Sequence, residues 1–224
     1  MTGPFCAECG QPRVHRITFK RTFRDGLDHV LSLDSAFLRT LIGLVRRPGR
    51  VCREYLEGRR KSYVAPVKYT FFAATIFALI VNFLDVLPTL PSTNDEQTVR
   101  LYRATLSALG YLAFLYVLPI ATLQAWLFRR PRYGIAECYA ALLFFYGQIL
   151  ILGILLAVTG LYATPYGYWI VHVVGLPYLW WLLTDLYDEP LGWILVKVLP
   201  LYFLVMLFNI DSDFVVGFLT GIGD

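Results

Sequence analysis

Charged side chains are scarce in this sequence. Only 16% of the 224 residues are Asp, Glu, Lys or Arg, and 57% belong to the hydrophobic set, whereas a soluble domain carries about 25% charged residues. A soluble protein of this size would need a polar coat that this chain cannot supply. The composition therefore predicts an all-α integral membrane protein, a polytopic helical bundle.

Cysteine and catalytic motifs are also sparse. The four cysteines, at positions 6, 9, 52 and 138, are too scattered for a disulfide framework. The sequence contains no Gly-rich phosphate loop, no His-Glu-x-x-His, no Gly-x-Ser-x-Gly elbow and no dinucleotide fingerprint, which argues against an enzyme without excluding one. No apolar segment of signal-peptide type opens the chain, so we expect the first span to remain as an uncleaved anchor.

Positive charge is concentrated in the first third of the chain. Residues 1–69 contain 14 Lys or Arg against 6 Asp or Glu, while residues 70–224 contain 6 against 10. A basic segment, residues 46–61, precedes the first apolar run. Because Lys and Arg beside a first span are retained in the cytoplasm, we expect a cytoplasmic region over residues 1–65 and a membrane bundle over residues 66–224.

Five apolar segments have the length of membrane spans. We place them at about residues 67–87, 102–128, 135–159, 168–186 and 191–208, since roughly 20 residues of helix cross a bilayer. This order puts the basic loop 129–132 on the same side as residues 46–61. The acidic loop 88–98 and the tail 209–224 then lie on the opposite side.

Amphipathic helices are predicted before the first span. The apolar spacing indicates helices over residues 18–32 and 35–47, ended by Pro48-Gly49, and a short third helix over residues 50–57. Their polar faces are basic, as in helices that lie in the membrane interface. Equally, they could form a helical hairpin packed under the bundle, and the two interpretations are compatible.

The basic residues of this segment have two interpretations. Lys and Arg at this position enforce topology. They could also form a binding site for anionic lipid headgroups or another phosphate ligand. The candidate residues are Arg46, Arg47, Arg50, Arg53, Arg59, Arg60 and Lys61. Because these residues are tethered beside a membrane, we expect lipid rather than nucleic acid as the partner.

The N-terminus carries a candidate metal motif. Cys6 and Cys9 form Cys-x-x-Cys-Gly, a spacing at which two thiolates can bind one zinc ion. A structural zinc site needs four ligands, and the nearest nitrogen ligands are His15 and His29. Either the chain completes the zinc site itself, or a homodimer shares it, or the two thiols are exposed and reduced.

We select four of the polar residues inside the apolar segments as candidate site residues: Glu137, Gln148, Asp185 and Lys197. Ionisable groups are costly inside a bilayer and usually have a partner there. We expect Lys197 to reach the interface or to pair with Glu137 or Asp185, either as a structural ion pair or in a proton or substrate relay. His172 is expected to be a hydrogen-bonded packing residue.

Several motifs recur together in a known kind of protein. They are Cys-x-x-Cys-Gly-Gln at residues 6–11, Arg-Pro-Gly at 47–49, Glu-Tyr-Leu-Glu-Gly-Arg-Arg-Lys-Ser-Tyr at 54–63, and Pro66. This order resembles a bacterial family of membrane proteins of unknown function. Residues 133–138 look like that family's segment before a later span, where a histidine commonly stands at the position of Cys138. The resemblance implies a multi-pass protein of the bacterial inner membrane and brings no activity with it.

Three functions follow as hypotheses. The first is a non-enzymatic scaffold or adaptor whose basic cytoplasmic face engages lipid or a partner. The second is a small transporter or permease subunit, with the four polar residues lining a path. The third is a membrane-embedded, lipid-modifying enzyme in which the arginines hold a phosphate.

Overall fold

The computed structural model describes residues 35–84, 96–128, 133–164, 166–187 and 189–220 of the chain, and every regular element among them is a helix. The elements are a helix over residues 35–46, α2 (Pro48–Leu56), the 3-10 turn η1 (Arg60–Ser62), α3 (Pro66–Phe83), α4 (Glu96–Leu127), α5 (Ile135–Val158), the 3-10 turn η2 (Leu161–Ala163), α6 (Gly167–Leu186) and α7 (Leu191–Thr220). The predicted all-α fold is confirmed.

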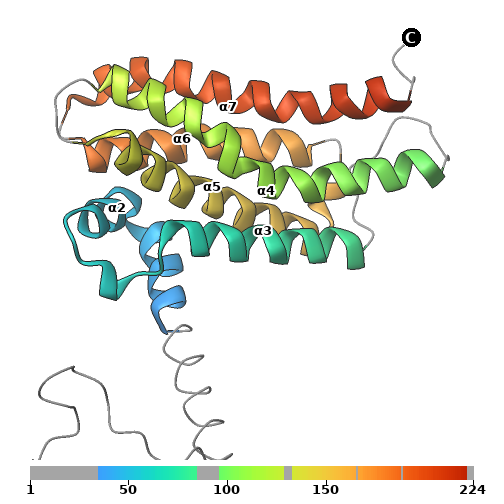
Figure 1. Ribbon diagram of the computed structural model, residues 1–224, viewed down its shortest axis with the longest axis horizontal. Helices are drawn as coiled ribbons and strands as arrows, with labels where there is room; N and C mark the ends of the chain where they lie inside the picture. The colour runs from blue at the N-terminus through green and yellow to red at the C-terminus, as the bar shows by residue number, and fades with distance from the viewer. Residues whose placement is uncertain (1–34, 85–95, 129–132, 165, 188, 221–224) are drawn as a thin grey trace, which may run out of the picture.

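The long helices run alongside one another around α5 (Figure 1). α5 contacts α3, α4 and α6, and α7 packs on α4 and α6. α5 is apolar on all sides, as expected of a helix inside a bundle. Gly147 lets α3 approach closely, because a Cβ atom there would lie 2.7 Å from the ring of Tyr69.

Four helices are long and apolar enough to cross a membrane. Their apolar segments are Arg60–Phe83, Gly110–Leu127, Ile135–Val158 and Trp169–Leu186. Their outward surfaces carry apolar side chains such as Leu115, which is 71% exposed. A soluble bundle would place polar residues there, so the protein is a multi-pass membrane protein.

The fifth predicted span, residues 191–208, corresponds to a shorter apolar segment of α7. Its described apolar part, Leu191–Leu207, has 17 residues, at the short end of the roughly 17–25 that cross a bilayer. The apolar segment ends where the sequence predicted, whereas the helix itself continues to Thr220. Residues 209–220 include no proline, so polar side chains alone do not end the helix.

α2 and the helix over residues 35–46 lie at one end of the bundle, where α4 ends and α7 begins (left in Figure 1). The predicted short helix over residues 50–57 is confirmed, but it starts earlier. Pro48-Gly49 begins α2 instead of ending the preceding helix, because proline at the first position of a helix lacks only an N–H that would have no partner there. The predicted helix over residues 18–32 lies outside the described residues.

Candidate functional site

The helix over residues 35–46, α2 and η1 together form what we call the juxtamembrane layer. In its first helix Leu44 is fully buried, whereas Leu38, Ile42 and Val45 are 54%, 50% and 56% exposed. These three positions follow helical spacing and form one stripe. The helix therefore has one apolar face against the bundle and a second apolar face that is exposed.

Hydrogen bonds fix this helix to the bundle. The Thr40 hydroxyl donates to the carbonyl of Ala36 at 2.7 Å and accepts the Val64 N–H at 3.0 Å. The Tyr178 hydroxyl of α6 donates to the carbonyl of Leu44 at 3.1 Å. Since the last carbonyls of a helix lack partners within the helix, the contact from Tyr178 completes its C-terminal end.

α2 packs directly on the backbone of α6. A Cβ atom at Gly49 would lie 2.2 Å from the Cβ of Asp185 and 2.5 Å from the carbonyl oxygen of Leu182. Only glycine fits at such a distance. Cys52, one turn further along α2, is fully buried, and burial raises the pKa of its thiol. Cys52 is thus a packing residue rather than a reactive one.

Arg53 joins α2 to the end of α6. Its guanidinium donates to the carbonyl oxygens of Asp185 and Leu186, the latter at 3.4 Å. These are carbonyls of the last turn of α6, where a positive charge also interacts favourably with the helix dipole. Although the sequence made Arg53 a candidate for anion binding, its structural position is at this helix end.

Glu54 interacts with three other side chains of the juxtamembrane layer and its flanking residues. It accepts hydrogen bonds from Arg50 Nε at 2.9 Å and from the Tyr63 hydroxyl at 2.8 Å, and it lies 3.7 Å from Arg59. The hydrogen bond from Arg50, followed by that from Tyr63, lowers the pKa of the Glu54 carboxyl. Glu54 therefore joins α2 to the residues on both sides of η1.

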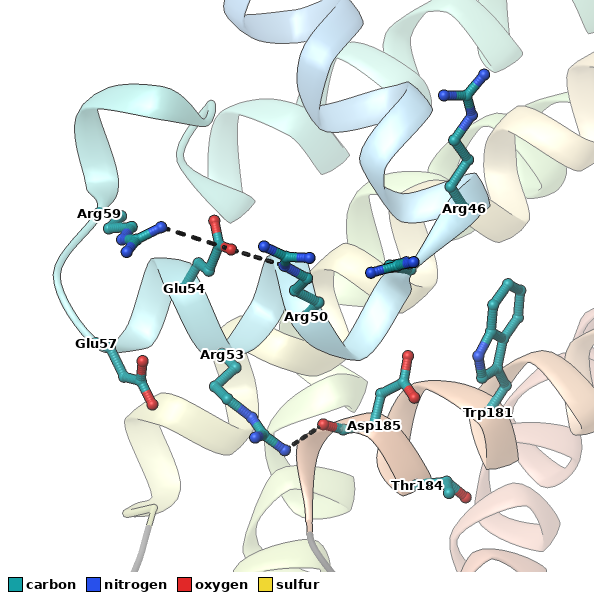
Figure 2. Close-up of a pocket in the computed structure, with 10 residues that line it drawn as sticks. Arg46, Arg50, Arg53, Glu54, Glu57, Arg59, Trp181, Thr184 and Asp185 are labelled. Carbon is teal, nitrogen blue, oxygen red and sulfur yellow. Dashed lines mark hydrogen bonds and ion pairs between the residues drawn. The ribbon is translucent and has the colours of Figure 1, made fainter.

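A hollow of about 740 Å³ lies between α2 and the C-terminal part of α6 (Figure 2). It is lined by Arg46, Arg47, Arg50, Arg53, Glu54, Glu57, Arg59, Trp181, Thr184 and Asp185. The side chains of Arg46, Arg47 and Asp185 make no hydrogen bond or ion pair with any residue that the structure describes. The hollow therefore contains both cationic and anionic groups that are available to a ligand.

Five of the seven predicted basic candidates line this hollow, and two do not. Arg60 lies over the ring of Tyr55, 5.8 Å from its centroid. Lys61 is exposed in η1. The structure also adds residues that the sequence analysis did not select, namely Glu54, Glu57, Trp181 and Thr184. Nothing in the sequence indicated that these four residues belong to one site, because only the packing of α2 on α6 brings them together.

The four predicted intramembrane polar residues all belong to the described part of the chain, and no hydrogen bond or ion pair joins any two of them. The Glu137 carboxylate accepts the Gly134 N–H at 2.6 Å at the start of α5. Gln148 accepts a hydrogen bond from Tyr69. Asp185 lines the hollow. Each residue thus serves a different part of the fold.

The predicted partner of Lys197 was wrong. Its ammonium pairs with Glu189 at 2.6 Å, not with Glu137 or Asp185, and lies 4.5 Å from the centroid of the Phe128 ring. Glu189 precedes α7 by a short turn, so the pair forms locally. The expectation for His172 is confirmed, since its Nδ1 lies 3.1 Å from the Tyr202 hydroxyl in a buried contact.

A second buried polar cluster joins α4, α5 and α6. Gln124 is fully buried and donates through Nε2 to the Tyr187 hydroxyl at 3.1 Å. The Cys138 sulfur lies 3.4 Å from the same hydroxyl, and the ring of Phe128 stacks on that of Tyr187. Gln124 and Cys138 interrupt apolar runs in the sequence, and this interruption could have indicated a polar cluster. Their shared partner Tyr187 could not be predicted.

No group of three or more His, Cys, Asp or Glu side chains that could hold a metal ion occurs in the described part of the chain. The predicted zinc ligands, Cys6, Cys9 and His15, lie outside the described residues.

Comparison with known proteins gives one match. Residues 34–78 match a family described as "Protein of unknown function (DUF3667)". The match includes the Arg-Pro-Gly and Glu-Tyr motifs and contains all five arginines of the hollow. No curated protein and no solved structure matches the chain. The chain is therefore similar to an uncharacterised family over its juxtamembrane layer and most of α3.

Proposed function

We propose that this protein is a non-enzymatic scaffold or adaptor of a bacterial inner membrane, which engages lipid or a membrane-bound partner through its juxtamembrane layer. One observation carries the proposal. The exposed apolar stripe of Leu38, Ile42 and Val45 lies on the same short helix as exposed Arg39 and Arg46. Apolar residues beside cations are the combination that binds an anionic membrane surface.

Charge supports a cytoplasmic position for this layer. Each Lys or Arg near an anionic leaflet contributes about 1 kcal/mol of attraction. The ends of α4 and α6 lie at the same end of the bundle as α2 (Figure 1), and the loop after α4 contains the basic residues 129–132. Both basic segments thus favour the cytoplasmic side for this end.

Spin labels test the lipid contact. In a variant without native cysteines, a label at Ile42→Cys is expected to collide with membrane-dissolved oxygen, whereas one at Arg46→Cys is expected to collide with a water-soluble nickel chelate. The two positions are one turn apart, so each is the control for the other. Equal exposure of both labels to the water-soluble reagent would contradict the proposal.

A membrane-impermeant thiol reagent tests orientation in the same background. A cysteine at Glu57, in the layer, is expected to react only in inside-out vesicles. A cysteine at Leu161, in η2 at the other end of the bundle, is expected to react only in right-side-out vesicles. The reverse pattern would overturn the cytoplasmic assignment.

A further inference from the structure

We propose that the hollow between α2 and α6 binds a group that carries both a phosphate and a primary ammonium, as in the headgroup of an aminophospholipid. This inference rests on the proposed function, because it specifies which lipid chemistry the juxtamembrane layer recognises. It follows from which charges around the hollow already have partners and which do not.

Some of the arginines that line the hollow are engaged within the protein. Arg50 and Arg59 interact with Glu54, which also accepts a hydrogen bond from the Tyr63 hydroxyl. Arg53 donates to the carbonyls at the end of α6. These contacts form the wall of the hollow and hold α2 in place.

Four other charged side chains that line the hollow have no such partner among the described residues: Arg46, Arg47, Glu57 and Asp185. Arg46 and Arg47 provide two cations and Asp185 provides an anion, and all three line the same hollow (Figure 2). Guanidinium groups match phosphate through paired N–H donors. A carboxylate matches a primary ammonium, which has three N–H donors.

The mixture of charges discriminates between headgroups. A headgroup with a phosphate only would be attracted by Arg46 and Arg47 but would meet the Asp185 carboxylate, which has no ion-pair partner among the described residues. A quaternary ammonium would meet that carboxylate without an N–H to donate. Of the two other lining carboxylates, Glu54 is already paired with Arg50 and Glu57 follows the C-terminal end of α2, whereas Asp185 lies against Gly49 near its start. Asp185 is therefore the lining carboxylate at the same end of α2 as Arg47.

The position of the hollow is that of a lipid headgroup. The apolar segment of α6 ends at Leu186, directly after Asp185. Trp181, which lines the hollow one turn earlier, is 41% exposed, and tryptophan is enriched where a span meets the headgroup region. A volume of about 740 Å³ lies within the usual range of ligand sites, roughly 300–1,000 Å³.

Native mass spectrometry of the purified full chain tests the proposal. The protein is mixed with equal amounts of phosphatidylethanolamine, phosphatidylglycerol and phosphatidylcholine that have the same acyl chains. The wild type is expected to retain phosphatidylethanolamine preferentially. Asp185→Asn is expected to lower that preference over phosphatidylglycerol about tenfold, the effect of one charge-assisted contact, while Asp185→Glu retains part of it.

A second pair of variants separates this inference from the proposed function. Arg46→Gln/Arg47→Gln is expected to reduce retention of both phosphatidylethanolamine and phosphatidylglycerol. The matched control Lys61→Gln/Lys68→Gln removes two exposed charges of the same region outside the hollow and is expected to retain both. Thermal unfolding and size-exclusion profiles confirm that each variant is folded.

The possible failures are distinguishable. If Asp185→Asn leaves the lipid preference unchanged while the double arginine variant still loses lipid, the inference is wrong and the proposed function stands. If the double arginine variant equals its control for every lipid, the proposed lipid contact of these arginines is wrong as well. Free phosphoethanolamine in excess identifies the source of the ligand: displacement of bound lipid would assign the same chemistry to a soluble molecule.

Discussion

Gly49 of α2 lies against Asp185 of α6 so closely that a Cβ atom at position 49 would be 2.2 Å from the Cβ of Asp185. This contact places the backbone of one helix on the side chain of the other. It sets the distance between the arginines at the start of α2 and the carboxylate at the end of α6. The Arg-Pro-Gly motif thus has a packing role, which is to let α2 begin on the surface of α6.

Gly49→Ala is expected to detach α2 from α6. Overpacking of a close contact costs about 1–3 kcal/mol, and here the backbone carbonyl of Leu182 also obstructs the new methyl group. The measurement is maleimide labelling of Cys52, which is fully buried in α2, in a Cys6→Ser/Cys9→Ser background. Gly192→Ala is the control, because nothing lies within 4 Å of its Cβ position. Equal labelling of the two variants would contradict the role of Gly49.

The Glu54 carboxyl is expected to make stability dependent on acid pH. Arg50 and Tyr63 hold its pKa below the ordinary value in the folded protein. The stability that these two contacts contribute is therefore fully present above the ordinary pKa of glutamate, about 4.3. It is lost as the pH falls through the lowered pKa of Glu54 in the folded protein. Glu54→Gln should lower the unfolding temperature at pH 7 and show a smaller further loss on acidification than the wild type does.

The control for this prediction is Glu57→Gln. Glu57 is exposed, and its side chain has no hydrogen bond or ion pair among the described residues. The Glu57→Gln variant should therefore lose stability on acidification to the same extent as the wild type. If the unfolding temperature of Glu54→Gln falls on acidification as much as that of the wild type, the Glu54 carboxyl does not cause the acid dependence of stability.

The sequence was sufficient for features that depend on local composition. Long apolar segments predicted the membrane class and the helices, because a span must satisfy its backbone groups internally. Helical spacing predicted a helix over residues 35–47, which the structure has over residues 35–46. The basic residues there selected Arg46, Arg47 and Arg50 as one group. Local rules failed at Pro48, which is acceptable both after one helix and at the start of the next.

The hollow itself could not be predicted, because it depends on contacts between distant segments. Asp185 was selected as an intramembrane polar residue, and the arginines were selected as a surface group. Nothing in their spacing indicated that α2 folds back onto α6. The pairing of Lys197 with Glu189 has a different origin, since the short turn before α7 offers a carboxylate that is nearer in the sequence than those on other spans.

Lys197 and Glu189 are expected to act as a structural pair. Their side chains are 13% and 18% exposed, so removal of one partner leaves a partly buried charge, at a cost of about 1–3 kcal/mol. Lys197→Met should lower the unfolding temperature, and Lys197→Met/Glu189→Gln should recover part of the loss. A double-mutant cycle measures the coupling. Additive effects would show that the two charges do not interact.

The Cys6-x-x-Cys9 motif is expected to bind zinc, with one ion per chain in the purified protein. Two thiolates and the His15 imidazole supply three of the four ligands that a structural zinc site requires. The measurement is metal content per chain by mass spectrometry. Cys6→Ser/Cys9→Ser should abolish zinc binding, whereas Cys138→Ser should retain it, because Cys138 is buried beside Tyr187.

The stoichiometry decides how the zinc site is completed. One zinc per chain that is lost in His15→Ala would make His15 a ligand. Half a zinc per chain would mean that two copies share four thiolates, and a homodimer should then dissociate when a chelator removes the metal. Wild-type protein purified without zinc, and unable to bind added zinc, would overturn the prediction and leave the two thiols as an exposed, reduced pair.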